Sequence, residues 1–129
     1  DLAGFYLSDE LTDDEDWHGI YNGGTASAST TTTDVDLDDD AVAGEWQVLR
    51  LEVMPNGTCR WYIDGELKQT VTGAVSTSTD YAVVLAAGAN TTQLNIFDCD
   101  YIFVEANRHW LNWIQLIFTV TSLAGISQR

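Results

Sequence analysis

The carboxylates of this chain are the residues that could most readily do chemistry, and their densest group runs from Glu10 to Asp16. A pair of carboxylates works as general acid and base only where the surroundings push the two pKa values apart. Around Asp13, Asp14 and Glu15 no aromatic residues alternate with the acids to bury one of them. We therefore interpret this run as a solvated loop and assign no catalytic residue to it.

Histidine-based catalysis would depend on His18 and His109, the two histidines of the chain. Because serines are plentiful, a Ser-His-Asp triad can be written on paper, but no nucleophile elbow or other positioning signature accompanies it. His18 follows Trp17 and His109 precedes Trp110, so we interpret both histidines as half-exposed aromatic residues at strand ends. We expect that the chain is not an enzyme and needs no cofactor.

Asp34, Asp36 and Asp38 are candidate metal ligands, because they alternate along the chain as in a calcium-binding loop. Such a loop needs a glycine at its sixth position, for a sharp turn, and a bidentate glutamate at its twelfth. Counting from Asp34, the twelfth residue is Glu45, which fits, and the sixth is Asp39, which does not. We therefore predict no metal ligands and keep a calcium loop as the weaker alternative.

Tryptophans offer a third chemistry, because exposed aromatic rings can stack on sugars. Trp17, Trp46, Trp110 and Trp113 are candidate stacking platforms, whereas Trp61 is better explained as a core residue. A glycan is accordingly an alternative partner.

The net charge excludes one class of partner. Twenty Asp and Glu residues outnumber five Lys and Arg residues, which gives a formal net charge of −15. Nucleic acid would be repelled, because its binding depends on neutralising phosphates with basic side chains. The hydrophobic content of 45% predicts that the chain nevertheless folds.

Neither a membrane span nor a compartment can be read from the chain. Its most apolar stretch, Leu111 to Val120, is shorter than the roughly 18 residues of a membrane-spanning helix and is interrupted by polar residues. Cys59 and Cys99 form either one bridge or two buried thiols, and we favour the thiols. Because the chain begins at Asp1 without a leader, we expect a processed product or an excerpt of a longer protein.

The elements that must position these residues are predicted to be strands. Short runs rich in Thr, Val, Ile, Tyr and Trp alternate with Gly, Asn, Asp and Ser, and no helical period is present. We expect residues 25–33 to form a surface strand or a loop, residues 86–90 to form a connector, and the strand at 94–104 to lie in mid-sheet. Strands are expected at residues 5–8, 19–22, 34–38 (an exposed edge strand), 46–53, 59–63, 80–87 and 94–104.

Residues 45–72 give the clearest pattern. Leu49, Leu51 and Val53 share one face of a strand, and residues 55–57 (Pro-Asn-Gly) then reverse the chain. A second reversal follows at residues 64–65 (Asp-Gly).

The geometry of this second reversal decides which residue faces Trp61. A two-residue turn would set Trp61 opposite Lys68, and a three-residue turn with a left-handed Gly65 would set it opposite Leu67. We favour the second geometry, because it buries Leu67 together with Trp61 and Leu51.

Five short segments carry a resemblance to a known family, and they are 44–46 (Gly-Glu-Trp), 49–53 (Leu-Arg-Leu-Glu-Val), 56–58 (Asn-Gly-Thr), 61–65 (Trp-Tyr-Ile-Asp-Gly) and 100–102 (Asp-Tyr-Ile). Over residues 4–110 the chain resembles a concanavalin A-like (laminin G-like) jelly roll. The resemblance implies an antiparallel two-layer β-sandwich like those of many bacteriophage structural proteins, secreted adhesins and carbohydrate-active enzymes. The Glu-x-Asp-x-x-Glu motif of glycosidases with this fold is absent from the chain.

Two departures from the family define the expected domain organisation. Family members usually carry further strands before the position of Phe5, so residues 1–110 resemble the C-terminal majority of a sandwich. Residues 111–129 have no counterpart and are expected to be an apolar extension, a strand that completes the sandwich or a tail that contacts a partner. The apolar residues of this tail include Trp113, Ile114, Leu116, Ile117, Phe118 and Val120.

The sequence thus predicts a non-enzymatic structural and interaction module of a phage particle, such as a capsid decoration or a fibre or tail component. Its partners would be further copies of itself or capsid and tail proteins, and its location would be the virion. The alternative is an extracellular carbohydrate-binding or adhesive module of a secreted protein.

Overall fold

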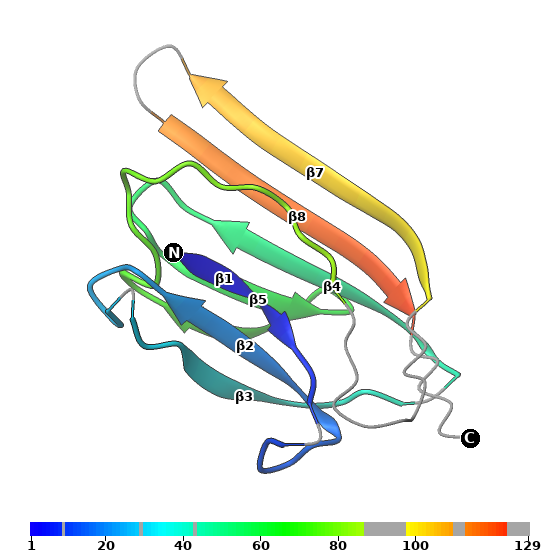
Figure 1. The fold of residues 1–129 in the computed structure, drawn as a ribbon. Helices are drawn as coiled ribbons and strands as arrows, with labels where there is room; N and C mark the ends of the chain where they lie inside the picture. Colours follow the sequence, from blue (N-terminus) through cyan, green and yellow to red (C-terminus); the bar gives the residue numbers. More distant parts are fainter. Residues whose placement is uncertain (9, 29, 43, 87–97, 110–112, 124–129) are drawn as a thin grey trace.

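The computed structural model describes residues 1–129 except for 9, 29, 43, 87–97, 110–112 and 124–129. The described residues form eight β-strands and no helix, which confirms the predicted all-β fold (Figure 1). The strands are β1 (Leu2–Tyr6), β2 (Asp16–Asn22), β3 (Thr33–Asp40), β4 (Trp46–Val53), β5 (Cys59–Ile63), β6 (Glu66–Val71), β7 (Cys99–His109) and β8 (Trp113–Leu123). Within this described part, no helix is long and apolar enough to span a membrane.

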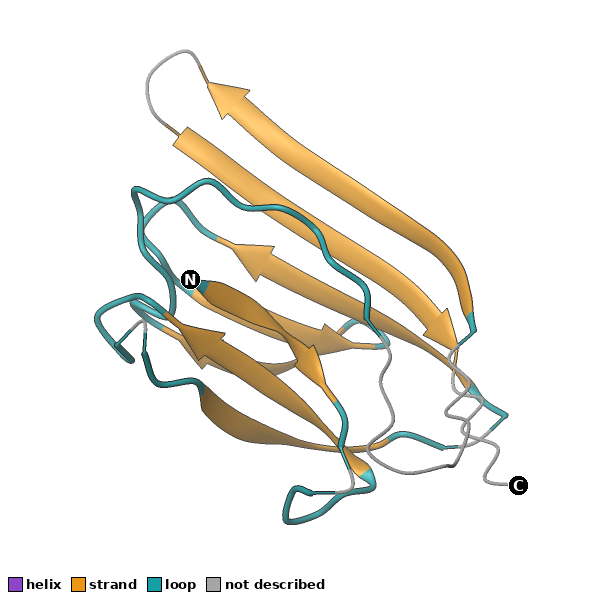
Figure 2. Ribbon diagram, viewed as in Figure 1, coloured by secondary structure: helices purple, strands orange, loops and turns teal. Residues whose placement is uncertain are grey.

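The strands form two antiparallel sheets that pack in a sandwich-like arrangement. The smaller sheet has the order β1-β2-β3, and the larger has the order β6-β5-β4-β8-β7. The smaller sheet lies over the half of the larger sheet that contains β4 and β5, while β7 and β8 extend beyond it (Figure 2).

A single hydrophobic core lies between the sheets, and Trp61 is at its centre. Its side chain is 0% exposed, and its Nε1 donates a hydrogen bond of 2.8 Å to the carbonyl oxygen of Gly4 in the opposite sheet. The ring of Tyr21 lies 6.1 Å from the Trp61 ring, between centroids. The buried core residues come from both sheets and one loop, and they are Trp17, Tyr21, Leu37, Leu49, Leu51, Val53, Cys59, Trp61, Ile63, Ala74 and Val75.

The β4–β5 hairpin has the predicted geometry. Leu49, Leu51 and Val53 are all buried on one face of β4, and Leu51 pairs with Trp61 across the two strands. At the turn, Gly57 has a φ of 79°, a value that glycine adopts without steric cost. Alternation and turn chemistry were therefore sufficient to place this hairpin.

The turn after β5 differs from the prediction. Asp64 and Gly65 form a two-residue turn, with φ angles of 49° and 86°, so that Ile63 pairs with Glu66. A bulge then shifts the register within the strands, and Trp61 lies opposite Gln69.

The prediction of a buried Leu67 was therefore wrong, and its side chain is 49% exposed. The tight turn is held at Asp64, whose Oδ1 accepts a hydrogen bond of 2.7 Å from the Val48 amide while its own amide donates to the Val48 carbonyl at 2.9 Å. Since Asp tolerates a left-handed backbone, the third turn residue was not needed.

The first half of the chain follows the predicted order with shifted boundaries. β1 begins at Leu2, ahead of the expected residue 5, and β2 begins at Asp16, directly after an acidic loop. The described residues between 25 and 32 form no strand. The expected edge strand is confirmed as β3, which ends the smaller sheet and buries Leu37 while Asp36 faces solvent.

The second half departs further from the prediction. The prediction of a strand at 80–87 was wrong for residues 80–86, which have no regular structure. Residue 87 lies outside the described part. Of the expected strand at 94–104, residues 94–97 lie outside the described part, and β7 begins at Cys99. Four of the five residues of the expected connector at 86–90 also lie outside it.

β7 is not the mid-sheet strand that its apolar run predicted, because it comes last in the order of the larger sheet. The segment expected as an extension, a strand or a partner-contacting tail contains β8, and β8 occupies the position between β4 and β7. An apolar run can belong to a strand buried in mid-sheet or to an exposed strand at the end of a sheet, and hydrophobic periodicity does not distinguish the two.

The two cysteines are free thiols. Cys59 is buried in the core, where burial raises its pKa to about 12. Cys99 is only partly buried. The expectation of two buried thiols is therefore confirmed for Cys59 and met only in part by Cys99.

Candidate functional site

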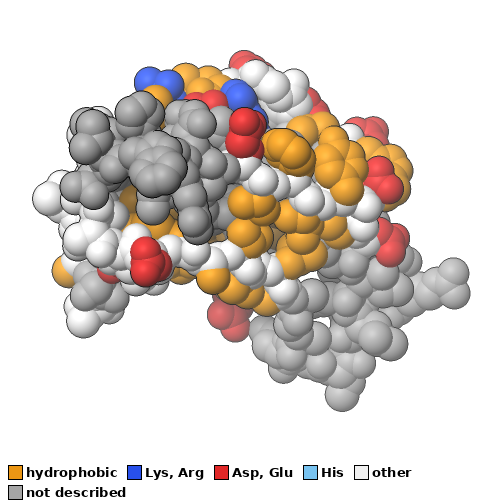
Figure 3. Space-filling view, turned by 90° about the horizontal axis from the view of Figure 1, so that it is seen from above, with side chains coloured by type: hydrophobic (Ala, Val, Ile, Leu, Met, Phe, Trp, Pro, Cys, Tyr) orange, Lys and Arg blue, Asp and Glu red, His pale blue; other side chains and the backbone are white. Residues whose placement is uncertain are grey.

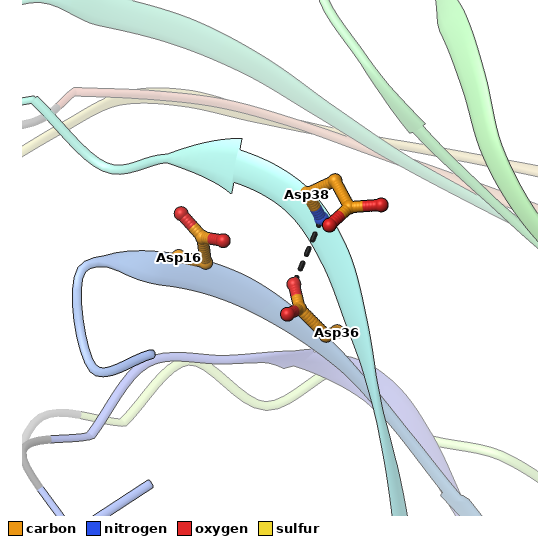
Figure 4. Close-up of side chains that lie close together, drawn as sticks. All are labelled: Asp16, Asp36 and Asp38. Carbon is orange, nitrogen blue, oxygen red and sulfur yellow. Dashed lines mark hydrogen bonds between the residues drawn. The ribbon is translucent and has the colours of Figure 1, made fainter. Parts of the chain in front are cut away.

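One group of carboxylates comes together where β2 and β3 pair. Oxygen atoms of Asp16, Asp36 and Asp38 lie within 4.8 Å of one another (Figure 4). Asp16 comes from the start of β2, where a bulge interrupts the pairing with β3. Asp38 has a φ of 49°, and its amide donates a hydrogen bond of 2.8 Å to Oδ1 of Asp36.

The crowding of negative charge changes the protonation of Asp16. A hydrogen bond with the side chain of Asp40, partial desolvation and repulsion from Asp36, Asp40 and Asp13 together raise the pKa of Asp16 to about 6. Asp16 thus holds a proton in mildly acidic solution that an isolated aspartate would have lost. The group is therefore a proton-binding feature of the β2–β3 edge.

The same three carboxylates could contribute oxygen ligands to a hard cation. Calcium takes six to eight oxygen ligands, so three carboxylates supply only part of a coordination shell. Asp36 and Asp38 are exposed. The geometry does not match the contiguous loop considered from the sequence, because residues 34–40 belong to a strand and the third carboxylate is Asp16.

Asp34 and Asp39, which belonged to the loop considered from the sequence, have other contacts. Oδ2 of Asp34 lies 3.4 Å from Nδ1 of His18, and Oδ2 of Asp39 lies 2.8 Å from Nζ of Lys68. Antiparallel pairing of β2 with β3 was the signal that could have brought Asp16 into the group, but the sequence alone did not give the register.

His18 is buried, with 3% of its surface exposed, so its interpretation as a half-exposed residue was wrong. Its Nε2 lies 3.3 Å from the carbonyl oxygen of Asp13, while Nδ1 makes no hydrogen bond. The acidic loop before β2 supplies this contact. The side chain of His109 lies outside the described part of the structure.

The tryptophans divide into buried and exposed residues. Trp17 is buried, and its Nε1 donates a hydrogen bond of 2.8 Å to Oε1 of Gln47, so it was wrongly considered as a sugar platform. Trp46 is 61% exposed. Trp110 and the side chain of Trp113 lie outside the described part.

An open hollow of about 510 Å³ lies beside Trp46. Five of its eight lining residues are acidic, and Trp46 and Val42 provide its apolar surface. A flat ring beside hydrogen-bond acceptors suits a polyhydroxylated ligand. The lining residues are Asp38, Asp39, Asp40, Val42, Glu45, Trp46, Gln47 and Asp64.

A run of exposed apolar side chains lies on β7. Tyr101, Ile102, Phe103 and Val104 follow one another along the strand, and each is between 43% and 51% exposed. Because successive side chains of a strand point to opposite faces, both faces of β7 are open to solvent here. Figure 3 views the molecule from the side on which β7 lies and shows hydrophobic side chains gathered there, with carboxylates among them. The sequence located these residues but assigned them to the sheet interior.

No family model matches the chain, and no curated protein or solved structure matches it at a significant level.

Proposed function

We propose that this chain is a non-enzymatic structural and interaction module of a phage particle, either a capsid decoration or a component of a fibre or tail. Its sandwich would be of the concanavalin A-like jelly-roll type. The observation that carries this proposal is the exposed apolar run on β7, the last strand of the larger sheet.

The physical argument concerns what such a strand does in water. Burial of each exposed apolar side chain on β7 would lower the free energy by about 25 cal/mol per Å² of apolar surface. A strand at the end of a sheet also presents backbone groups that can pair with another chain. Monomeric proteins usually protect such strands with charge, bulges or covering loops. β7 has a bulge at its start, between Cys99 and Tyr101, whereas Tyr101 to Val104 are apolar, exposed and regularly paired with β8, so this part of the strand is suited to an interface.

The distribution of charge supports the same function. The formal net charge of −15 keeps the free chain soluble, while residues 101–104 carry no charge. A module of this kind remains dispersed until its apolar strand meets a matching surface. The virion is the location that follows from the proposal.

Mass spectrometry of density-purified particles from the source of the sequence tests this function. Peptides of this chain should appear in the particle fraction in a fixed ratio to the capsid protein. A chain that is found only in the soluble fraction, with intact particles lacking it, would contradict the proposal.

A second function, glycan binding by a secreted adhesive module, is favoured by Trp46 and the acidic hollow beside it. A glycan array should then give hits that Trp46→Ala abolishes, whereas Leu67→Ala, which removes an exposed apolar side chain elsewhere, should leave them unchanged. An array without hits would remove this alternative.

A further inference from the structure

We propose that the smaller sheet carries a zinc site, in which Nδ1 of His18 and the carboxylates of Asp34 and Asp36 are the protein ligands. This inference goes beyond the proposed function and does not rest on it, because it concerns the face of the β2–β3 pair that points away from the larger sheet.

The three residues lie on one face of the β2–β3 pair. Gly19 of β2 lies against the core, so its neighbour His18 points to the opposite face. On β3, Leu37 is buried in the core, so Asp36 points to the opposite face and Asp34, two residues earlier, shares that face. His18 and Asp36 are direct partners in the strand register.

The imidazole of His18 is the observation that carries this inference. It is 3% exposed, and its Nε2 lies 3.3 Å from the carbonyl oxygen of Asp13. Since a carbonyl oxygen only accepts hydrogen bonds, Nε2 is the donor, and Nδ1 of the neutral ring has a lone pair. Nδ1 is buried and makes no hydrogen bond. Metal-binding histidines have the same arrangement, in which the other ring nitrogen donates to a carbonyl or carboxylate.

The distance from Nδ1 of His18 to Oδ2 of Asp34, 3.4 Å, fits two ligands of one tetrahedral ion. Zinc binds nitrogen and oxygen ligands at about 2.0–2.2 Å in tetrahedral geometry, which sets two such ligands about 3.4 Å apart. An octahedral ion with bonds of about 2.1 Å would set them about 3.0 Å apart. A lone pair aimed at the tetrahedral ion points about 35° away from the oxygen, so this geometry also explains why no aligned hydrogen bond joins the two atoms.

Ligand type and charge favour zinc as the occupant. Imidazole nitrogen is a ligand for zinc and its neighbours, whereas calcium and magnesium take oxygen ligands. Asp34 and Asp36 supply two negative charges to a divalent ion. Directly opposite residues on one face have Cβ atoms about 4.5–5.5 Å apart, which places Asp36 within reach of an ion bound at His18. The Asp34 side chain is 54% exposed, so water can take the fourth position.

Isothermal titration of the full, chelator-treated chain with zinc chloride tests the site. Excess magnesium in the buffer occupies exposed carboxylates that bind hard cations. The wild type should bind one zinc ion per chain with micromolar or tighter affinity, and Asp34→Asn should weaken this binding at least about tenfold. Because Asp34 is exposed, this substitution should leave the fold intact, which near-UV circular dichroism checks.

Two control variants locate the ion. Asp38→Asn removes one negative charge, as Asp34→Asn does, but from the group of Asp16, Asp36 and Asp38, and it should leave zinc affinity within about threefold of the wild type. His109→Gln removes the other histidine and should also leave it unchanged. The proposal is overturned if the wild type binds no zinc, if Asp34→Asn binds it equally well, or if either control variant loses it.

Imidazole nitrogen resonances, measured by NMR on the isotope-labelled chain, test the ligand atom itself. Zinc should shift the Nδ1 resonance of His18, while Nε2 of the same ring should keep its proton and its hydrogen bond to Asp13. A zinc-dependent shift confined to His109, or loss of the proton from Nε2 of His18, would contradict the site. Since both measurements use the isolated chain, its absence from phage particles would refute the proposed function and leave this inference standing.

Discussion

At the scale of single residues, Trp61 holds the two sheets together, and Gly19 makes room for it. The indole of Trp61 donates a hydrogen bond to the Gly4 carbonyl and is fully buried. Moving the ring aside would therefore break this hydrogen bond and disturb the packing of the core. A Cβ atom at Gly19 would lie 3.1 Å from this ring, closer than ordinary van der Waals contact. Gly19 therefore allows a close approach between β2 and β5, and a side chain there would require the Trp61 ring to shift by a few tenths of an ångström.

We expect Gly19→Ala to lower the free energy of unfolding by about 1–3 kcal/mol, the usual cost of overpacking a core. Urea denaturation followed by tryptophan fluorescence measures it. Gly4→Ala is the matched control, since its Cβ would meet nothing closer than 4.0 Å and the change should stay within about 0.5 kcal/mol. Equal effects of the two substitutions would contradict the packing argument.

Asp16 gives the molecule a pH dependence at the residue scale. Its pKa is raised from 3.8 to about 6 in the folded chain, so the folded state binds more protons than the unfolded state between these values. The stabilisation from this proton is present below the unfolded pKa and is lost as the pH rises through about 6.

Asp16→Asn should therefore match the wild type in stability near about pH 4 and exceed it near about pH 7.5, by at most about 1 kcal/mol because solvent screens these carboxylates. Urea denaturation at both pH values measures the difference. Asp14→Asn is the control, because Asp14 is not among the groups that raise the pKa of Asp16. A constant difference between wild type and Asp16→Asn at both pH values would show that Asp16 does not bind the proton.

At the scale of elements, the turn at Asp64 and Gly65 sets the register of β6 against β5. Both residues have positive φ angles, and the Asp64 carboxylate ties the turn to the start of β4. Only with this turn does Lys68 lie at the bulge, where its ammonium group reaches Asp39 of the other sheet at 2.8 Å. The hydrogen bonds that the Lys68 ammonium group donates to Asp39 and Glu66 raise the pKa of Lys68. The hairpin thus links the two sheets at their edge.

We expect Gly65→Ala to cost about 1–2 kcal/mol of stability. The cost is purely conformational, because a Cβ atom at Gly65 would meet nothing within 4 Å. Gly65→Asn, which tolerates a left-handed backbone, should cost less than half as much. Thermal unfolding of the two variants compares them, and equal losses would argue against backbone strain as the cause.

At the scale of the whole molecule, a net charge of −15 opposes both folding and association. Salt screens this repulsion, since the Debye length falls from about 30 Å at 0.01 M to about 8 Å at 0.15 M. Apolar contacts such as those of Trp61 in the core are not weakened by this change.

Raising the ionic strength over this range should therefore raise the melting temperature. Differential scanning calorimetry at the two ionic strengths provides the measurement. A melting temperature that stays constant or falls would contradict a destabilising effect of the net charge.

Local sequence signals determined the parts of this fold that depend on neighbours in the chain. The alternation of Leu49, Leu51 and Val53 fixed the buried face of β4, and the glycine turns placed the hairpins that follow. The alternating aspartates likewise identified β3 as an edge strand. Side-chain period and turn conformation depend on a few adjacent residues, so the chain alone reveals them.

Tertiary structure decided what depends on residues far apart in the chain. The insertion of β8 between β4 and β7 moved the apolar strand to the end of the sheet, and His18 became buried with its Nε2 beside the carbonyl oxygen of Asp13. The two-residue turn at Asp64 and Gly65 set Leu67 opposite Tyr62 and left it exposed, and strand pairing joined Asp16 to Asp36. Each outcome depends on the free energy of pairing and burial over the whole sheet, and the same local pattern is compatible with more than one partner.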